Sequence, residues 1–288
     1  MNEFVNDFVC RIDQINTRED LRALYDWIWD NKDKVATTAA ALNAELNLDG
    51  DKELKPDLPC LSVGSTEGLV VLAANPGWKA ELNAKEDAYC RRSREEYVDM
   101  MFGFFHRHPI VRDGEYARWW TRAMKWMVLL PGWNEGDCPN PTAARWEHIH
   151  NTGRLGGWEL FPWHSSKDGL TSKIAKHTWL AKFMRSSVGA VLRLKPQLLF
   201  VASSTGYGVI RHDLLPELSW TDFALSGTKC AYARTDENTD IVAIKLQLFG
   251  GAFRKFKDHD LIAKVQEIRA SNARNLPSMV RFPSVAAT

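Results

Sequence analysis

The feature that most constrains this chain is a series of short apolar runs separated by long helical segments. These runs are LVVLAA from Leu69, GGWELF from Gly156, QLLFVA from Gln197 and IVAIKLQL from Ile241. Apolar runs with little alternation are typical of strands buried on both faces, and intervening helices allow such strands to pair in parallel. The sequence therefore predicts an α/β fold, a three-layer α/β/α arrangement around a mostly parallel sheet of about four strands.

Helical patterns account for most of the remaining chain. Apolar residues recur every three or four positions from Phe4 to Leu46, and the polar stretch Asn47–Pro59 follows them. We therefore predict an N-terminal helical cap over residues 1–60 and the α/β/α domain over residues 61–288. Thr171–Leu194 is amphipathic and predicts a helix, as do residues 84–105, 117–130 and 258–273, whereas KCAYART from Lys229 predicts an edge strand.

Composition narrows the possible classes of protein. No run reaches the roughly 20 apolar residues that cross a bilayer, and the acidic start MNEFVNDFVCRID is unlike a signal peptide. The five cysteines are far apart and include no CxxC pair, so they predict neither a disulfide framework nor a zinc site. We expect a cytoplasmic monomer with no membrane association, no metal and no cofactor.

The net charge of +1 hides an uneven distribution. Residues 1–60 contain 13 acidic and 7 basic residues, a net charge of −6, so residues 61–288 carry a net charge of +7. The basic excess lies in the strand-bearing part of the chain. This distribution is compatible with a polyanionic partner, although many enzymes are equally basic.

The residues that follow the four strands are the candidates for catalysis and ligand binding, because ligands of such sheets bind beyond the carboxyl ends of the strands. The first strand leads into Asn75-Pro76-Gly77-Trp78 and the second into a segment with Glu159 and His164. Asn-Pro-Gly can be a simple turn, or it can present an amide and a ring to a water and a flat ligand. His148 and His150 would share a face on a strand, but no carboxylate or cysteine accompanies them to complete a metal site.

The motif VLAANPGW resembles the first motif of the uracil-DNA glycosylase superfamily, particularly its mismatch-specific and single-strand-selective branches, with Ala73 in place of a glycine. WELFPWHSS resembles the second-strand motif, in which a polar residue reads the edge of the extruded base, and Glu159 has that place. KPQLLFVASSTGYG resembles the third strand and its small-residue turn. The fourth exit differs, because Leu248-Phe249-Gly250-Gly251 replaces a His-Pro-Ser type motif.

This resemblance implies a DNA glycosylase that flips out a base and hydrolyses its N-glycosidic bond, with DNA as partner. Asn75 and His164 would be catalytic, and Trp78, Glu159 and Phe249 would bind the base or fill its place in the stack. The residues expected at the DNA backbone are Gly250, Gly251, Arg254, Lys255 and Lys257.

A carboxylate at position 159 favours a modified cytosine over uracil, because it can accept a hydrogen bond from the exocyclic amine of cytosine. This resembles the logic of superfamily members that act on altered cytosines, including enzymes that remove sugar-decorated hydroxymethylcytosine from viral DNA in defence against phage. Two other functions stay open from the sequence. One is a nucleoside or nucleotide hydrolase without duplex DNA, and the other is a non-catalytic nucleic-acid-binding module.

Overall fold

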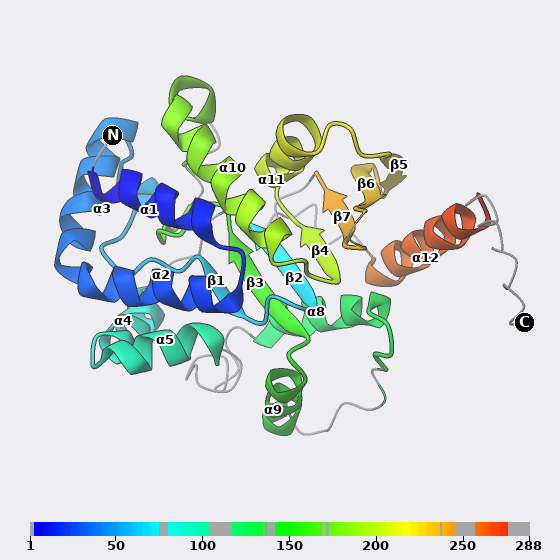
Figure 1. The fold of residues 1–288 in the computed structure, drawn as a ribbon, viewed down its shortest axis with the longest axis horizontal. Helices are drawn as coiled ribbons and strands as arrows, with labels where there is room; N and C mark the ends of the chain where they lie inside the picture. The colour runs from blue at the N-terminus through cyan, green and yellow to red at the C-terminus, as the bar shows by residue number, and fades with distance from the viewer. Residues whose placement is uncertain are drawn as a thin grey trace, which may run out of the picture.

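The computed structural model describes residues 3–74, 80–103, 117–134, 136, 142–167, 169–170, 173–236, 238–245 and 257–275. These residues form an α/β fold in which one mixed sheet is flanked by helices (Figure 1). The strands are β1 Ser62–Gly64, β2 Leu69–Ala73, β3 Leu155–Glu159, β4 Leu198–Val201, β5 Thr221–Leu225, β6 Thr228–Arg234 and β7 Asp240–Ile244.

The sheet has the strand order β1-β3-β2-β4-β7-β6-β5 within the described residues. Its centre, β3-β2-β4-β7, is parallel, and these are the four strands that the apolar runs predict. β1 pairs antiparallel with β3 at one side, while β6 and β5 continue antiparallel from β7 at the other. The sheet is therefore larger than the predicted four strands, and the additional strands are all antiparallel.

The prediction of Lys229–Thr235 as an edge strand is wrong. β6 occupies this region, but β5 pairs with its outer side and is itself the edge. Residues of β5 alternate between half-buried and exposed, and the strand is only five residues long. Such a short, half-polar strand gives a weak sequence signal, which is why β6 was expected to be outermost.

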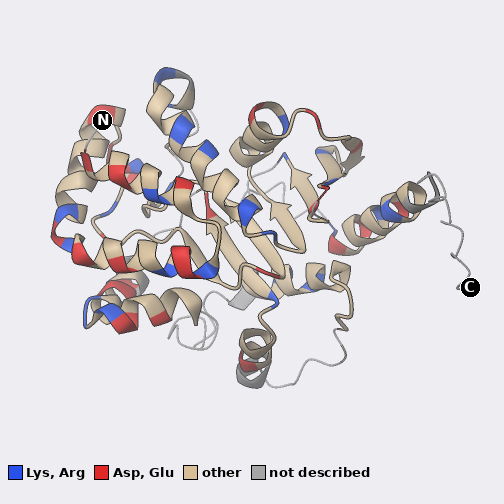
Figure 2. Cartoon of the chain, viewed as in Figure 1, with Lys and Arg blue, Asp and Glu red and all other residues tan. Residues whose placement is uncertain are grey.

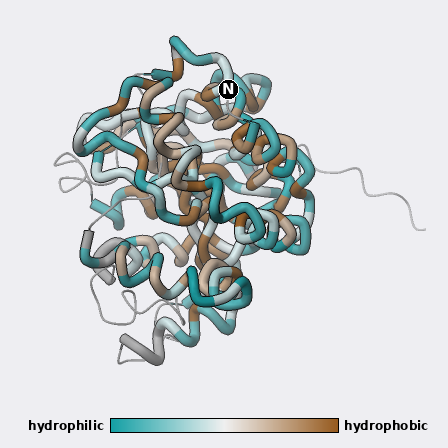
Figure 3. Tube along the Cα trace, turned by 90° about the vertical axis from the view of Figure 1, so that its left-hand side faces the viewer, coloured by the Kyte–Doolittle hydropathy of each residue, from teal (hydrophilic) through white to brown (hydrophobic). Residues whose placement is uncertain are grey.

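Successive residues of the central strands point to opposite faces and enter two separate hydrophobic clusters. Val70 and Leu72 of β2 join the cluster that includes the N-terminal helices, whereas Leu69 and Val71 join the cluster on the other face. Phe200 of β4 lies in the second cluster and stacks on Trp126, with ring centroids 3.9 Å apart. Both faces of the parallel strands are thus covered, and the hydrophobic segments run through the middle of the molecule (Figure 3).

Helices make up the rest of the described chain. The predicted N-terminal helices are confirmed as α1, α2 and α3, and their hydrophobic residues share one cluster with the sheet. The helices are α1 Glu3–Gln14, α2 Arg18–Asp30, α3 Lys32–Leu46, α4 Ala80–Cys90, α5 Arg94–Phe102, α8 Ala117–Trp126, α9 Thr142–Thr152, α10 Thr178–Arg193, α11 Ser204–Gly208 and α12 Asp258–Asn275. A π-helical segment, η5, covers Val209–Leu214, and short 3₁₀ turns lie at 50–52, 127–129 and 174–176.

The structure corrects two predictions about helices: the start of the helix predicted from Thr171, and the placement of His148 and His150 on a strand. α10 begins at Thr178 rather than Thr171, because a 3₁₀ turn at 174–176 precedes it. His148 and His150 lie on α9, not on a strand, so two residues of helix separate them by about 200° and they do not share a face. Among the described residues, no group of three or more His, Cys, Asp or Glu is arranged to hold a metal ion.

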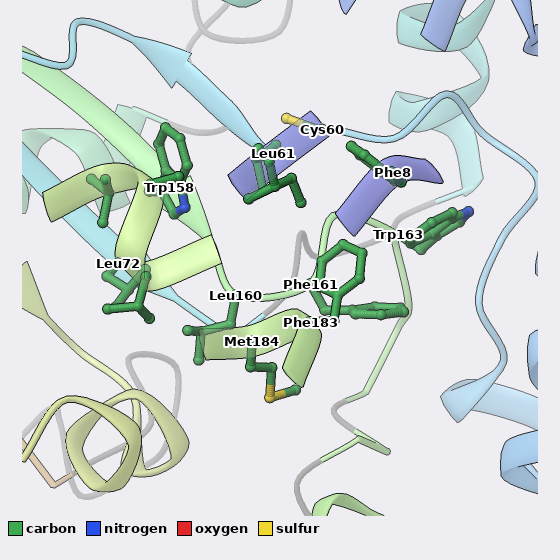
Figure 4. Packing of buried hydrophobic residues seen from close by; sticks show 14 of the residues in the cluster. Phe8, Cys60, Leu61, Leu72, Trp158, Leu160, Phe161, Trp163, Phe183 and Met184 are labelled. Carbon is green, nitrogen blue, oxygen red and sulfur yellow. The ribbon is translucent and has the colours of Figure 1, made fainter. Parts of the chain in front are cut away.

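The segment that follows β3 is fixed by an aromatic cluster (Figure 4). Phe161 and Trp163 insert between Phe8 of α1 and Phe183 of α10, and all four rings are at most 2% exposed. Ring centroids are 4.9 Å apart for Phe161 and Phe183 and 5.6 Å apart for Phe8 and Trp163. Because these rings are buried in contact with two helices, the residues on either side of them have fixed positions relative to the sheet.

Candidate functional site

The carboxyl ends of β2 and β4 form a topological switch point. The chain leaves β2 to reach β3 on one side of it, and it leaves β4 to reach β7 on the opposite side. Connections that diverge in this way open a crevice between neighbouring strands, and this is where ligands of parallel sheets bind. In the sequence, Asn75 comes two residues after the end of β2, and Ser203 comes two residues after the end of β4.

Asn75 and Trp78 lie outside the described residues, but both ends of their segment are defined. The carbonyl of Ala74 accepts a hydrogen bond from the Phe161 amide at 3.1 Å, and that of Ala73 accepts one from the Leu160 amide at 3.0 Å. α4 then begins at Ala80. Ala74, the residue before the Asn-Pro-Gly motif in the sequence, therefore lies next to the exit of β3, where Glu159 lies.

Glu159 is the last residue of β3, and its Cα pairs with that of Ala73. Its backbone is fully engaged: the amide donates to the Leu61 carbonyl at 2.8 Å, and the carbonyl accepts from Ser187 Oγ at 2.7 Å. The residue is partly exposed as a whole, yet its Oε2 atom is enclosed and has no hydrogen-bond partner among the residues that the structure describes. Burial raises the pKa of the Glu159 carboxyl well above its ordinary value.

Other acidic groups surround the same region. The pKa of the buried Cys60 thiol is raised by desolvation first and then by the charges of Glu86 and Glu159. Both carboxyls therefore lie close enough to Cys60 to act on it electrostatically. Glu86 comes from α4, so the helix that follows the Asn-Pro-Gly motif and the end of β3 bring acidic groups to one place.

His164 is 5% exposed and lines a small pocket at this end of the sheet. Its Nδ1 atom lies 3.9 Å from Asp57 Oδ2, too far for a hydrogen bond, and has no partner within the described residues. The other residues that line this pocket are Asp57, Leu58, Asn83, Glu86, Asp87, Cys90 and Met101. Glu159 Oε2 and His164 Nδ1 are thus both enclosed and without a hydrogen-bond partner among the described residues, and of these two residues only His164 lines the pocket.

Asp57, Asn83 and Glu86 are site residues that sequence reasoning missed. Asn83 and Glu86 are buried in spite of their polar side chains, and they share a face of α4 at a spacing of three residues. Asp57 is brought in by the loop before β1, whose Lys55 amide donates to the His164 carbonyl at 2.9 Å. In the sequence these residues belong to polar segments that look solvent-exposed, so no local signal marks them.

The exit of β4 is the start of a short helix rather than a simple turn. Ser203 caps α11, because its Oγ accepts a hydrogen bond from the Gly206 amide at 3.2 Å. A Cβ at Gly206 would lie 2.9 Å from Val201 Cγ1 and 3.4 Å from Leu72 Cδ2, so a glycine allows this helix to pack closely on the strands. The small residues predicted here therefore shape one wall of the switch point.

Most of the fourth exit lies outside the described residues, including Phe249, Gly250, Gly251, Arg254 and Lys255. Lys257 is described and exposed, immediately before α12. Asp258, the next residue, forms an ion pair with Arg122 of α8 at 2.8 Å and accepts a hydrogen bond from Trp126 Nε1 at 3.0 Å. These contacts fasten the start of α12 to α8, so the position of Lys257 is defined by the fold.

No family model, curated protein or solved structure matches this chain. In the part of the chain that the structure describes, no helix is both long and apolar enough to cross a membrane. Interpretation of the site consequently depends on its own geometry and chemistry.

Proposed function

We propose that this protein is a DNA glycosylase that flips out a base, a modified cytosine, and hydrolyses its N-glycosidic bond. The observation that carries the proposal is the enclosed Oε2 atom of Glu159, which has no hydrogen-bond partner among the described residues. Glu159 pairs with Ala73, two residues before the Asn-Pro-Gly motif in the sequence, at a switch point of the sheet. The two hydrophobic clusters on opposite faces of the sheet favour the three-layer α/β/α arrangement that goes with it.

The reaction needs an attacking water and a leaving base. The water oxygen bonds to the sugar C1′, the bond to the base nitrogen breaks with its electron pair moving to the base, and the proton lost by the water is taken up by solvent or a side chain. Asn75 positions the water and stabilises positive charge that develops on the sugar. His164 donates a hydrogen bond to the departing base, and Trp78 stacks on it.

Glu159 reads the edge of the flipped base, and its protonation state decides how. An ionised carboxylate only accepts hydrogen bonds, so it suits the amine of a cytosine-type base. A neutral carboxyl has one donor and one acceptor, so it can match the edge of either cytosine or uracil. Because burial raises the pKa of Glu159, base selectivity depends on pH in the range where this group titrates.

The remaining roles concern the DNA outside the pocket. Arg254, Lys255 and Lys257 contact phosphates, Phe249 fills the gap left by the extruded base, and Gly250 and Gly251 allow close approach of the backbone. The abasic strand is then the product.

The test is incubation with DNA containing uracil, a thymine mismatch, or hydroxymethylated or glucosylated cytosine, followed by detection of alkali-labile abasic sites. Asn75→Ala should fold normally and lose about 10²–10³-fold in excision rate, since one positioned polar group contributes roughly 3–4 kcal/mol to the barrier. Full activity of a folded Asn75→Ala protein would remove Asn75 from the reaction.

A nucleoside hydrolase is the second candidate, because the net charge of +1 and the carboxylates around the His164 pocket do not favour a polyanion close to this pocket. Release of free base from nucleosides but not from DNA would establish that alternative. DNA binding without release of any base would instead indicate a binding module.

A further inference from the structure

Exposed positive charge gathers in the first half of helix α10 and just before it. Lys182 and Arg185 are exposed on α10, and Lys176 is exposed just before it; we call these three residues the α10 basic stripe. Figure 2 shows that α10 carries Lys and Arg but no Asp or Glu. Residues 160–195 contain seven Lys or Arg residues and one acidic residue, Asp168.

Three of the other four basic residues of this segment have structural contacts, and the fourth, Lys195, follows the opposite end of α10. Lys167 pairs with Asp51 at 2.6 Å, and Lys173 Nζ donates to the Asn47 carbonyl at 3.2 Å. Arg193 donates to the Ile12 and Ile15 carbonyls at the end of α1. These residues hold the N-terminal helices in place, so they do not contribute to the stripe.

The three residues of the α10 basic stripe differ from these residues in their partners. Within the described residues, neither Lys176 nor Lys182 has an acidic partner within 4 Å. Arg185 faces Asp213 of η5 at 3.7 Å, and both side chains are more than 40% exposed, which makes this pair weak. The stripe therefore presents largely uncompensated positive charge to solvent.

Hydrogen bonds between α10 and β3 place the start of α10 beyond the carboxyl ends of the strands, where the candidate site lies. Ser187 Oγ bonds both the Glu159 carbonyl and Trp158 Nε1, so this position of α10 lies level with the carboxyl end of β3. α10 connects two parallel strands, β3 and β4, and runs antiparallel to them. At 1.5 Å per residue, Lys182 lies about 7.5 Å beyond Ser187 along the helix. Lys176 precedes the first residue of α10, and Figure 1 shows this end of α10 projecting past the strands.

We infer that the α10 basic stripe binds the phosphates of the nucleic-acid strand next to the flipped nucleotide. The inference rests on the proposed function for its choice of polyanion, but the charge and the position of the stripe are independent of Asn75 and His164. Lys182 and Arg185 lie about 4.5 Å apart along the helix axis and Lys176 lies before the start of the helix, a spread over which one strand of DNA presents more than one phosphate at roughly 3.4 Å of axis each.

The experiment compares two triple variants with equal loss of charge. The test variant is Lys176→Ala, Lys182→Ala, Arg185→Ala. The control variant is Lys34→Ala, Lys125→Ala, Arg234→Ala, which removes two exposed lysines and one exposed arginine from α3, α8 and β6. Thermal denaturation and circular dichroism first establish that both variants are folded.

Binding to a DNA duplex without a target base is then measured as a function of salt. The test variant should lower the slope of log K against log salt by about 2.7, since each phosphate contact contributes about 0.9. Between 50 and 200 mM salt, this difference means that wild-type affinity falls about 40-fold more than that of the variant. The control variant should keep a slope close to that of the wild type.

The salt slopes of the test and control variants decide whether the α10 basic stripe binds phosphates. Equal slopes for the test and control variants would overturn the inference, even if the wild type excises bases. A lower slope for the test variant alone supports it, even if no base is released, in which case only the glycosylase proposal fails. Stripe-dependent binding to phosphatidylserine vesicles without stripe-dependent binding to DNA would also overturn it, because the surface would then serve a membrane.

Discussion

Replacing Glu159 by Gln should stabilise the folded protein at neutral and alkaline pH. In the folded state the Glu159 Oε2 atom is enclosed without a partner, and burial raises the pKa of the carboxyl well above its ordinary value. A folded-state pKa above the unfolded one means that the contribution of Glu159 to stability is fully present below the unfolded pKa. It is lost as pH rises through the folded pKa, because folding must then bury a charge.

The size of the effect follows from the buried charge. Gln has the same size as Glu and would lack the same hydrogen-bond partner, but it carries no charge. Glu159→Gln should therefore raise the free energy of unfolding by the extra cost of the charged form, on the order of 1–3 kcal/mol near pH 8, and by little near pH 5. For a chain of 288 residues, that corresponds to a rise in Tm of roughly 2–5 °C.

The assay is thermal denaturation of the wild type and Glu159→Gln from about pH 5 to about pH 8. Glu147→Gln, at an exposed position of α9, is the control, because it removes the same charge without relieving burial. A Glu159→Gln protein that is less stable than the wild type near pH 8 would refute the reasoning. It would mean that Glu159 has a stabilising structural partner rather than a carboxyl held for a ligand.

The remaining predictions concern base selectivity and the backbone of β3. The excision ratio between cytosine-derivative and uracil DNA should fall for the wild type as pH is lowered through the Glu159 titration, by about 5- to 150-fold for a hydrogen-bond mismatch of 1–3 kcal/mol. In Glu159→Gln the ratio should stay low at every pH, and identical ratios in the two proteins would exclude a role in base reading. Gly156→Ala should destabilise the fold by about 1–3 kcal/mol or more, because its Cβ would lie 1.8 Å from the Ser65 carbonyl oxygen. Gly208→Ala, where a Cβ meets nothing within 4 Å in a helix, should be neutral or stabilising by up to about 1 kcal/mol in urea denaturation, and similar losses for both variants would contradict this packing argument.

The central strands could be predicted from the sequence because each is an apolar run long enough to be recognised without its neighbours. β2 and β4 are examples, since all but the last residue of β2 and every residue of β4 are buried. β1 has only three residues and β5 is half-exposed, so their places in the sheet depend on pairing partners that no local pattern specifies. The order of the strands likewise depends on long-range packing rather than on the composition of any one run.

The candidate site was only partly predictable for a related reason. Glu159 and His164 could be singled out by their positions after a strand, but their burial could not. It arises because the loop before β1 crosses the segment after β3, where the Lys55 amide bonds the His164 carbonyl and the Lys167 amide bonds the Asp51 carbonyl. The same crossing of the two segments encloses Asp57, which lies in a stretch with the composition of a polar linker.

The aromatic cluster beside these residues makes their lack of partners informative. Phe161 and Trp163 are packed against two helices, so the segment between Glu159 and His164 cannot relax easily to bring its polar atoms to water. Buried polar groups in folded proteins nearly always have hydrogen-bond partners, and a rigid segment that withholds them loses stability. A ligand that supplies a donor or acceptor to Glu159 and to His164 would recover that loss on binding, which is the expected energetic signature of a binding site at this end of the sheet rather than of a packing defect.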